Sequence, residues 1–431
     1  MFRKLMLLLA APMVLGAQQM TDTTLHPITV QDAVRLAEQN NVSAITAGNQ
    51  IRTANYNVRA ARAELYPTAT VSAGQSKSGG QRLGQSGTLV PYNPSWTYNT
   101  GFSSNMTLFD GGRAFADIRT QKANVVAAEA GQTTTQFTIA LNVKTQYNLI
   151  LAAKEQEAAA QVQLQLAQQQ LATSIAKVNA GAANVSDSLR GVLGVGNAQL
   201  SILTAQNNLR VASAELTRTV GTPYFVTADY ADTVEHKYAP VDSASIVQMA
   251  LNGPTVKQSI AQLNSSLAAL RAAKAAYLPS ISASFNYGGN GTGVYTGPEF
   301  PYTHTIGLSL NYPLFNRFSR ENTAAVAQIN IENAQATLKD QQLAAQQNIV
   351  TYIGSLHLAE ESMRIQELSV QASEEDLRVV QQRYALGAGT LLDVLTSQSN
   401  LITARQQLIQ ARLTYRNARA QIESVIGRDL P

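Results

Sequence analysis

The stretch QRYALGAGTLLDVL, residues 382–395, interrupts a long helical pattern with two glycines and then restarts it. On both sides of it an apolar residue returns every seventh position, which is the spacing of a seam between packed helices. The upstream positions are Ile349, Leu356, Met363, Val370, Leu377 and Tyr384, and the downstream positions are Val394, Leu401, Leu408, Tyr415 and Ile422. Small residues between two such runs predict a turn. We therefore expect a helical hairpin far longer than an ordinary globular one.

An earlier part of the chain repeats this pattern. Residues 177–182 resemble residues 383–388, and Asp187 stands where Asp393 does, so the copies lie about 206 positions apart. Residues 108–110 and 314–316 keep the same offset. We infer that the chain is an internal duplication, with a first repeat at 18–221, a linker at 222–242 that suits a small equatorial belt, and a second repeat at 243–431.

Each copy has the same expected order of a helix, two strands and a helical hairpin. The first helices are expected at 31–65 and 243–278, because each pattern ends at a residue before proline. Alternating polar and apolar residues then predict strands at about 66–80, 97–109, 279–288 and 302–315. Long helices follow at about 112–177 and 319–383, with hairpin tips at about 177–187 and 383–393.

The strands carry aliphatic and aromatic residues on one face and small or polar residues on the other. Ile306, Leu308 and Leu310, for example, alternate with Gly307 and Ser309. This suits transmembrane strands, whereas a soluble hairpin lying on a core is the alternative for any single pair. Four strands cannot close a barrel, and open edges are not tolerated in lipid. Three copies would supply twelve strands, enough for a water-filled lumen.

Bulk composition narrows the function classes. The chain has 431 residues, no cysteine and a charged fraction of 14%, and its formal charge of +4 comes from basic residues spread singly. Disulfides, thiolate metal sites and a cysteine nucleophile are excluded, and nucleic-acid binding gains no support. The four histidines lie far apart without metal-ligand spacing, so we expect no metal, no cofactor and no catalytic residue.

The N-terminus reads as an export signal. A short basic start and an apolar run precede small residues near position 17, which predicts a signal peptide at 1–17. The run is too short to span a bilayer, and a buried N-terminal helix is the alternative. Because no cysteine follows the leader, a lipid anchor is not expected.

Several motifs together resemble the TolC-like outer-membrane efflux proteins. They are the helix-to-strand junctions LYPT (65–68) and YLPS (277–280), LFDGGR (108–113) after the second strand, and RYALG (383–387) followed by LDVL (392–395). The resemblance covers nearly the whole chain after the signal peptide. It implies an α plus transmembrane β-barrel fold, in which a homotrimer forms a 12-stranded outer-membrane barrel continued by a periplasmic tunnel of helical hairpins.

The same resemblance implies a function and partners. The protein is expected to be the outer-membrane channel of a tripartite efflux pump or type I secretion system, conducting solutes passively. Its partners would be two further copies of itself, outer-membrane lipid, a periplasmic adaptor at the hairpin tips and, through that adaptor, an inner-membrane pump. It would not be an enzyme. A periplasmic coiled-coil adaptor or structural rod is the alternative, and a secreted hydrolase is a weaker one because no convergent acid, base or nucleophile set is visible.

The resemblance also assigns residues. Tyr384, Asp393 and Asp187 match gate positions at the periplasmic aperture. The tips Asn179, Ala180, Gly181 and Ala182, and Ala385, Leu386, Gly387 and Ala388, match the adaptor contacts.

Two departures from the family pattern weaken an expected salt-bridged lock. Gly389 stands where the best-known relative has an arginine, and Thr396 stands where it has a second aspartate. We therefore expect a gate that rests on Tyr384 and packing, with a ring of Asp393 retained. A ring of aspartates at a constriction favours cations, whereas stabilisation of a helix N-terminus is the alternative role for Asp393.

Overall fold

The computed structural model describes residues 24–77, 79–92, 96–229, 243–292 and 301–430. The expected signal peptide and residues 230–242 of the expected linker lie outside these ranges. The chain forms two compact units. We call Thr46–Thr135 with Gln248–Gln347 the sheet unit. The remainder, Met1–Ile45, Gln136–Val247 and Asn348–Pro431, is the hairpin unit.

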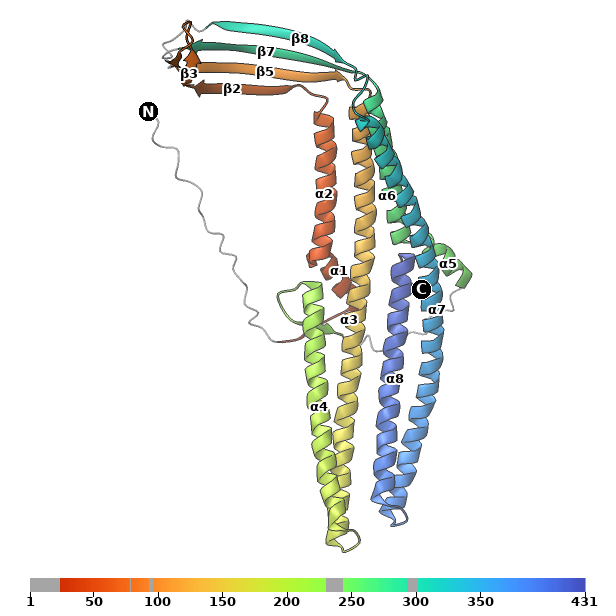
Figure 1. Ribbon diagram of the computed structural model, residues 1–431. Coiled ribbons are helices and arrows are strands. Elements are labelled where there is room, and N and C mark those ends of the chain that lie inside the picture. The colour runs from red at the N-terminus through yellow and green to blue at the C-terminus, as the bar shows by residue number, and fades with distance from the viewer. Residues whose placement is uncertain (1–23, 78, 93–95, 230–242, 293–300, 431) are drawn as a thin grey trace. The chain divides into compact units, whose positions relative to one another are not determined.

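The sheet unit is built on four antiparallel strands in the order β2-β5-β7-β8 (Figure 1). They are β2 (Thr68–Ser76), β5 (Thr97–Phe109), β7 (Ser280–Thr292) and β8 (Tyr302–Asn311). The central pair joins segments far apart in sequence, with Phe102 opposite Tyr287. A short ribbon of β3 (Gly80–Leu83) and β4 (Leu89–Tyr92) follows β2 and was not predicted. β2 and β8 are the two edges of the four-stranded sheet as described.

Helices lead into and out of this sheet. They are α2 (Val42–Ala63), α6 (Pro254–Lys274) with the short 3-10 turn η2 (Ala275–Tyr277), and the first parts of α3 (Arg113–Asn179) and α7 (Ser319–Ala385). The hydroxyl of Ser265 on α6 donates a hydrogen bond to the amide oxygen of Asn124 on α3. These helices are rich in Ala and polar residues, so their packing relies on small side chains and such polar contacts.

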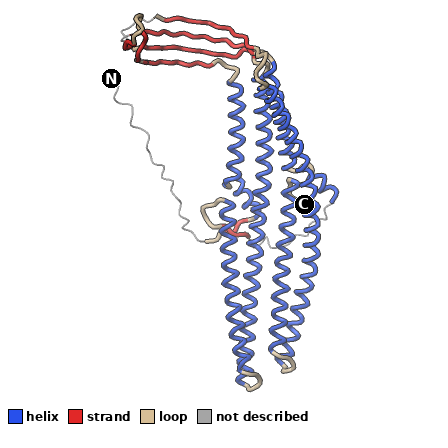
Figure 2. Tube along the Cα trace, viewed as in Figure 1, coloured by secondary structure: helices blue, strands red, loops and turns tan. Residues whose placement is uncertain are grey.

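The hairpin unit contains the rest of α3 and α7, together with their return helices. α3 turns into α4 (Val185–Val220), and α7 turns into α8 (Leu391–Ile426) (Figure 2). Both long helices have 67 residues and both return helices have 36. Within α4, a Cβ at Gly191 would approach the Cα of Leu171 to 3.2 Å. The absence of a side chain there allows close contact between α3 and α4.

The heptad positions of α7 and α8 form the seam of the second hairpin, as the sequence predicts. Ile349, Val394 and Ile422 are fully buried, and Leu377, Tyr384 and Leu401 are nearly so. The remaining predicted positions on α7 and α8 are half-buried. The opposite faces stay open to solvent.

A second core of the hairpin unit gathers around Tyr147 on α3. The short parallel strands β1 (His26–Ile28) and β6 (Val226–Ala228) pair beside it. The phenol of Tyr147 donates to the carbonyl of Ile28 and accepts from the amide of Asp229, both at 3.0 Å. Tyr147 thus fastens the two strands to α3. Three-residue strands carry too little alternation to be read from sequence, so neither was predicted.

Both expected first helices are broken, so the prediction of a single helix at 31–65 and at 243–278 was wrong. In the first copy α1 (Val30–Asn40) ends at Asn41, whose backbone is extended with φ −66° and ψ 134°. The Asn41 side chain donates to the carbonyl of Thr219 at 2.8 Å and accepts from the amide of Ser43 at 2.8 Å. These bonds replace the helical ones that the break removes.

In the second copy the break falls between α5 (Ser243–Ala250) and α6. Pro254 is the first residue of α6, and Gly253 precedes it with extended backbone. Proline has no amide hydrogen to donate to the preceding turn and its ring fits only the start of a helix. The sequence Gly253-Pro254 indicates a helix break, but the helical periodicity on both sides of it predicted a single helix.

The strand ends also differ from the expected ones. β8 ends at Asn311 rather than near 315, because Pro313 follows and cannot donate to a ladder. β7 runs to Thr292 rather than to about 288, and β2 ends at Ser76 rather than near 80. The ends of β2 and β7 consist of glycines and small polar residues, so the sequence there shows no alternation of polar and apolar side chains. Both strands pair with β5, and this pairing sets how far they extend.

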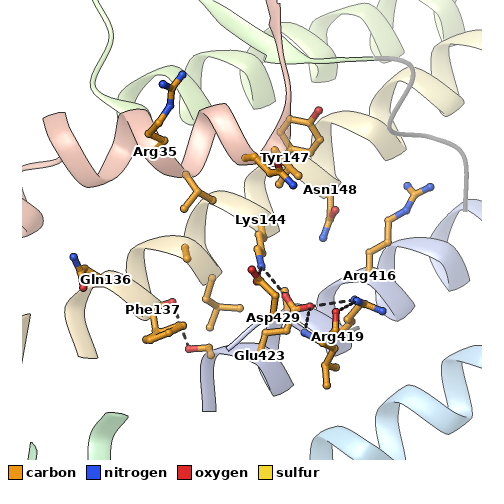
Figure 3. Close-up of a pocket in the computed structure, with 18 of the residues that line it drawn as sticks. Arg35, Gln136, Phe137, Lys144, Tyr147, Asn148, Arg416, Arg419, Glu423 and Asp429 are labelled. Atoms are coloured by element: carbon orange, nitrogen blue, oxygen red, sulfur yellow. Dashed lines mark hydrogen bonds and ion pairs between the residues drawn. The ribbon is translucent and has the colours of Figure 1, made fainter. Parts of the chain in front are cut away.

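An ion network lies in the hairpin unit beside a cavity of about 760 Å³. Figure 3 shows Lys144 of α3 pointing at Glu423 and Asp429, with Nζ–O distances of 2.7 and 2.6 Å. The nearly buried Glu423 also accepts from Arg419 and from the amide of Leu430, both at 3.1 Å. Burial alone would lower the pKa of Lys144, but the hydrogen bonds and charges of Asp429 and Glu423 raise it above its ordinary value.

Lys144→Met is expected to lower the free energy of unfolding by about 2 kcal/mol, because Glu423 keeps other donors but loses its ammonium partner. Since the pKa of Lys144 is raised, its contribution is present at neutral pH and is lost as pH rises through the folded-state value above 10.5. Urea unfolding in detergent at pH 7 and pH 11 measures both. Arg364→Met, which breaks an exposed pair with Glu361, is the matched control, and an equal effect of the two changes would contradict the prediction.

Candidate functional site: the hairpin tips

The two hairpin tips have the same backbone conformation. At the first, the amide of Gly181 donates to Val178 and that of Ala182 donates to Lys177, at 3.0 and 2.8 Å. At the second, Gly387 donates to Tyr384 and Ala388 donates to Arg383, at 3.1 and 2.8 Å. This pair of bonds is the Schellman motif, which needs a left-handed residue after the helix; Gly181 and Gly387 supply it with φ of 69° and 78°.

The sequence-predicted contact residues all lie on the surface of these turns. Asn179, Ala180, Gly181, Ala182, Ala385, Leu386, Gly387 and Ala388 are exposed. Leu386 is 85% exposed, which is unusual for a leucine in a tight turn and leaves an apolar side chain projecting from the tip. The geometry thus offers a small apolar surface with accessible backbone at each tip.

Asp393 lies in the first turn of α8 and closes a capping box with Thr390. Its carboxylate accepts from the amide of Thr390 at 2.9 Å and from the hydroxyl at 2.8 Å, and its own amide donates back to Thr390 at 3.2 Å. These backbone and hydroxyl hydrogen bonds, and to a lesser extent the charge of Arg383, hold the pKa of Asp393 below its ordinary value. Asp393 therefore stabilises the helix start and stays ionised, and both roles weighed from the sequence are chemically open to it.

Asp187 occupies the corresponding turn of α4 but is bonded differently. The cap of α4 is Asn184, whose side chain accepts from Ser186 rather than from Asp187. Among the described residues no hydrogen bond or ion pair involves the Asp187 carboxylate. The half-buried carboxylate of Asp187 is therefore free to accept a hydrogen bond or pair with a cation from another chain.

Tyr384 is placed at the end of α7 and is 6% exposed. Its ring packs with the buried Leu391 and Val394 of α8 and with Leu377 of α7. Among the described residues, no hydrogen bond or ion pair joins Tyr384 to either aspartate. The structure therefore does not bring the three predicted gate residues together within one chain.

Lys177 of the other hairpin also contacts Tyr384, and the sequence analysis did not predict this residue as part of the site. Its Nζ lies 3.8 Å from the centre of the Tyr384 ring and donates a hydrogen bond to the Tyr384 carbonyl. The signal that could have found it is the duplication, since Lys177 is the counterpart of Arg383, the neighbour of Tyr384.

The two positions that depart from the family pattern have local explanations. A Cβ at Gly389 would lie 3.3 Å from the amide nitrogen of Tyr384 and 3.4 Å from the Cβ of Arg383, so the turn is tight around it. The hydroxyl of Thr396 donates to the carbonyl of Leu392 at 2.9 Å, within its own helix. Neither Gly389 nor Thr396 carries a charge, so neither can take part in a salt bridge at the hairpin tip.

Two apolar surfaces lie outside the tips. On α4, one side of the helix exposes seven large apolar side chains: Val185, Leu189, Val192, Leu193, Leu200, Leu203 and Val211. On β8 of the sheet unit, Ile306, Leu308 and Leu310 are 78, 74 and 70% exposed. Apolar surfaces of this extent mark contact with protein or lipid.

Other kinds of site find no support in the described ranges. No group of three or more His, Asp or Glu residues there is arranged to hold a metal ion. In the same ranges, no helix has the length and hydropathy needed to cross a membrane. Four charged side chains that line the cavity beside Lys144 already pair with one another: Lys144, Arg419, Glu423 and Asp429.

A sheet with an exposed apolar face and two long hairpins with matched tips define an outer-membrane channel protein with a helical tunnel. The chain belongs to the outer membrane efflux protein family, whose model matches residues 33–222 and 246–428. This confirms the family that the motifs indicated.

Relatives with assigned functions are similar along most of the chain. The pyoverdine export outer membrane protein OpmQ of Pseudomonas putida is 24% identical over 91% of this chain and 84% of its own length. TolC of Escherichia coli is 23% identical over 68% of this chain and 62% of its own length. BepC of Brucella suis reaches 30% identity, but over 41% of this chain and 40% of its own length. All three relatives are named as outer-membrane proteins, two of them with the words efflux or export, and none of these names describes an enzyme.

Solved structures share the fold. The CusC channel superposes with a TM-score of 0.78 at 19% identity, covering 94% of each chain. The outer membrane protein VceC of Vibrio cholerae gives a TM-score of 0.73 at 17% identity, covering 93% of this chain and 97% of that one. These superpositions show a TolC-like fold, and the family match gives the chain its place among the outer membrane efflux channels.

Proposed function

We propose that this protein is the exit duct of a tripartite efflux pump or type I secretion system and conducts solutes passively across the outer membrane. The single observation that carries the assembly is the four-stranded sheet, whose apolar face and two edges are open in one chain. An open edge is not tolerated in lipid, so strands of further copies must pair with β2 and β8. Three copies close a twelve-stranded barrel wide enough for water.

The hairpins support the same assembly. The equal lengths of α3 and α7, and of α4 and α8, suit a ring in which duplicated hairpins alternate around a tunnel. The exposed apolar side of α4 needs a helix against it, and a second copy supplies one. We further propose that the tips meet a periplasmic adaptor, through exposed backbone and side chains such as Leu386, and that the adaptor connects the duct to an inner-membrane pump.

At the aperture we assign three roles. Tyr384 narrows the tunnel, Asp393 contributes a ring of negative charge, and Asp187 offers a free carboxylate to a neighbouring subunit. The support for Asp393 is its exposed, ionised carboxylate at the start of α8.

Asp393→Asn tests both the channel and the ring. In planar bilayers the purified wild-type protein is expected to form cation-selective pores that trivalent cations block. The variant should lower the cation-to-anion permeability ratio by about twofold to fivefold and weaken the block, because three charges leave the constriction. Thr390 remains the N-cap of α8, and the amide oxygen of asparagine can still accept from the Thr390 amide.

The control is Glu375→Gln, an exposed carboxylate on α7 that pairs with Arg378. It should leave the selectivity unchanged. Equal block in wild type and Asp393→Asn would refute the ring but not the channel, whereas a wild-type protein that never conducts would refute the channel.

A further inference from the structure

Lys177 joins the two hairpins of one chain near their tips, through its contacts with Tyr384. It lies in the last turn of α3, and both of its partners, the ring and the carbonyl of Tyr384, lie at the end of α7. The contact therefore joins the hairpin α3/α4 to the hairpin α7/α8. It belongs wholly to the hairpin unit.

Three effects favour an ammonium at this place. The Tyr384 carbonyl is one of the last acceptors of α7, where the helix carries partial negative charge. It accepts from Lys177 as well as from Gly387. The ring face 3.8 Å from Nζ adds a cation–π attraction, which is stronger for a half-buried ammonium than for an exposed one.

No carboxylate competes for this ammonium among the residues that the structure describes. Tyr384 is held from its other side by the apolar cluster of α7 and α8, so the ring cannot turn away without opening that cluster. Its phenol oxygen is buried and has no hydrogen-bond partner in the described chain. The aromatic face and the backbone carbonyl of Tyr384, and not its hydroxyl, therefore carry the contact.

The counterpart of Lys177 in the duplication behaves differently. Arg383 directs its guanidinium to the carbonyl of Ala388, 3.5 Å away in its own turn. Arg383 therefore forms its contact within its own hairpin, whereas Lys177, at the corresponding position of the first repeat, contacts the other hairpin.

We propose that Lys177 is the latch that holds the two hairpins of a subunit together at the aperture, so that its release from Tyr384 accompanies opening of the tunnel. This inference rests on the proposed function, because it treats the tips as the closed end of a channel.

Lys177→Met tests the charge and keeps the length of the side chain. It is expected to raise the open fraction of single channels in planar bilayers by about tenfold, whereas Lys177→Arg restores a cation and should stay near wild type. Tyr384→Phe removes only the unpartnered hydroxyl and is the reference for the fluorinated series below. Equal open fractions for Lys177→Met and wild type would overturn the latch.

Graded fluorination separates the cation–π contact from packing. Phenylalanine with one, two or three ring fluorines at position 384 keeps the shape and progressively weakens the negative ring face. The open fraction should rise in steps along the series. Because this series leaves Lys177 in place, it decides the question even if Lys177→Met fails to assemble, and a flat response would overturn the ring contact.

Hydrogen exchange of the tip peptide 383–390 gives a readout that does not need conduction. Loss of the ammonium from the end of α7 should speed exchange of these amides in Lys177→Met by about fivefold, with Lys177→Arg unchanged. If wild type does not conduct but exchange responds, the contact stands and the proposed function fails. If wild type conducts and exchange does not respond, the latch fails and the proposed function stands.

Discussion

Leu308→Lys is expected to abolish stable insertion of this protein into the outer membrane. Leu308 lies in the middle of β8, is 74% exposed, and faces the same side as Ile306 and Leu310. A lysine at the middle of the lipid face of a barrel costs about 2–4 kcal/mol, and a trimer would incur that cost three times. The variant should therefore appear in the periplasm or be degraded. Membrane fractionation on a sucrose gradient measures the result.

The adjacent residue provides the control. Ser309 points to the opposite face, where its hydroxyl lies 2.7 Å from that of Ser282 on β7. If that face lines a water-filled lumen, Ser309→Lys should still reach the outer membrane in near wild-type amounts. Equal loss of both variants, or normal insertion of Leu308→Lys, would contradict the assignment of the lipid face.

Replacing Leu193 and Leu203 together by glutamate should prevent assembly of the proposed trimer. Both leucines lie on the open side of α4 and are 67 and 64% exposed, so a single subunit loses little by the change. In an assembly each leucine would bury apolar surface that stabilises the interface by about 1.5–3 kcal/mol. The glutamates would remove that contribution and place unpaired charges in the interface. Light scattering in detergent should report subunits in place of trimers.

The same two positions changed to methionine form the matched control. Methionine keeps apolar volume, so the trimer should persist. Circular dichroism should show equal helix content in both variants, since neither side chain contributes to the core of one chain. A trimer that survives both glutamates would show that this side of α4 faces something other than a second copy.

The regular part of the fold was predictable because its sequence repeats. A heptad seam such as Ile349 to Tyr384 needs only periodicity to be recognised, and the observed ends of α3 and α7 lie within about two residues of the expected ones. The breaks at Asn41 and Gly253 were missed because each is a local event of a few hydrogen bonds. The residue types at these positions, Asn and Gly-Pro, do indicate a helix break. The helical periodicity of the residues on both sides nevertheless favoured one continuous helix.

The tips were predictable to a different degree. The glycine turns were found, and their Schellman geometry follows from residue type. Lys177 was missed because its partner lies on another hairpin, and no local pattern reports a contact across about 200 residues of sequence. Asp393 was expected to face a pore, and its capping box with Thr390 shows that a helix-terminal role is already in place.

The matched helix lengths limit how this protein can evolve. One extra residue in α3 would rotate everything beyond it by about 100°, which would move every seam residue off its partner on α4. Length changes in the long helices are thus selected against, while substitutions that keep a residue's size and polarity are tolerated. Its relatives are expected to diverge by replacement within the helices and to gain or lose residues only in the turns and strand loops. Comparing the helix lengths of OpmQ, which is 24% identical over 91% of this chain, with those of α3, α4, α7 and α8 would test this expectation.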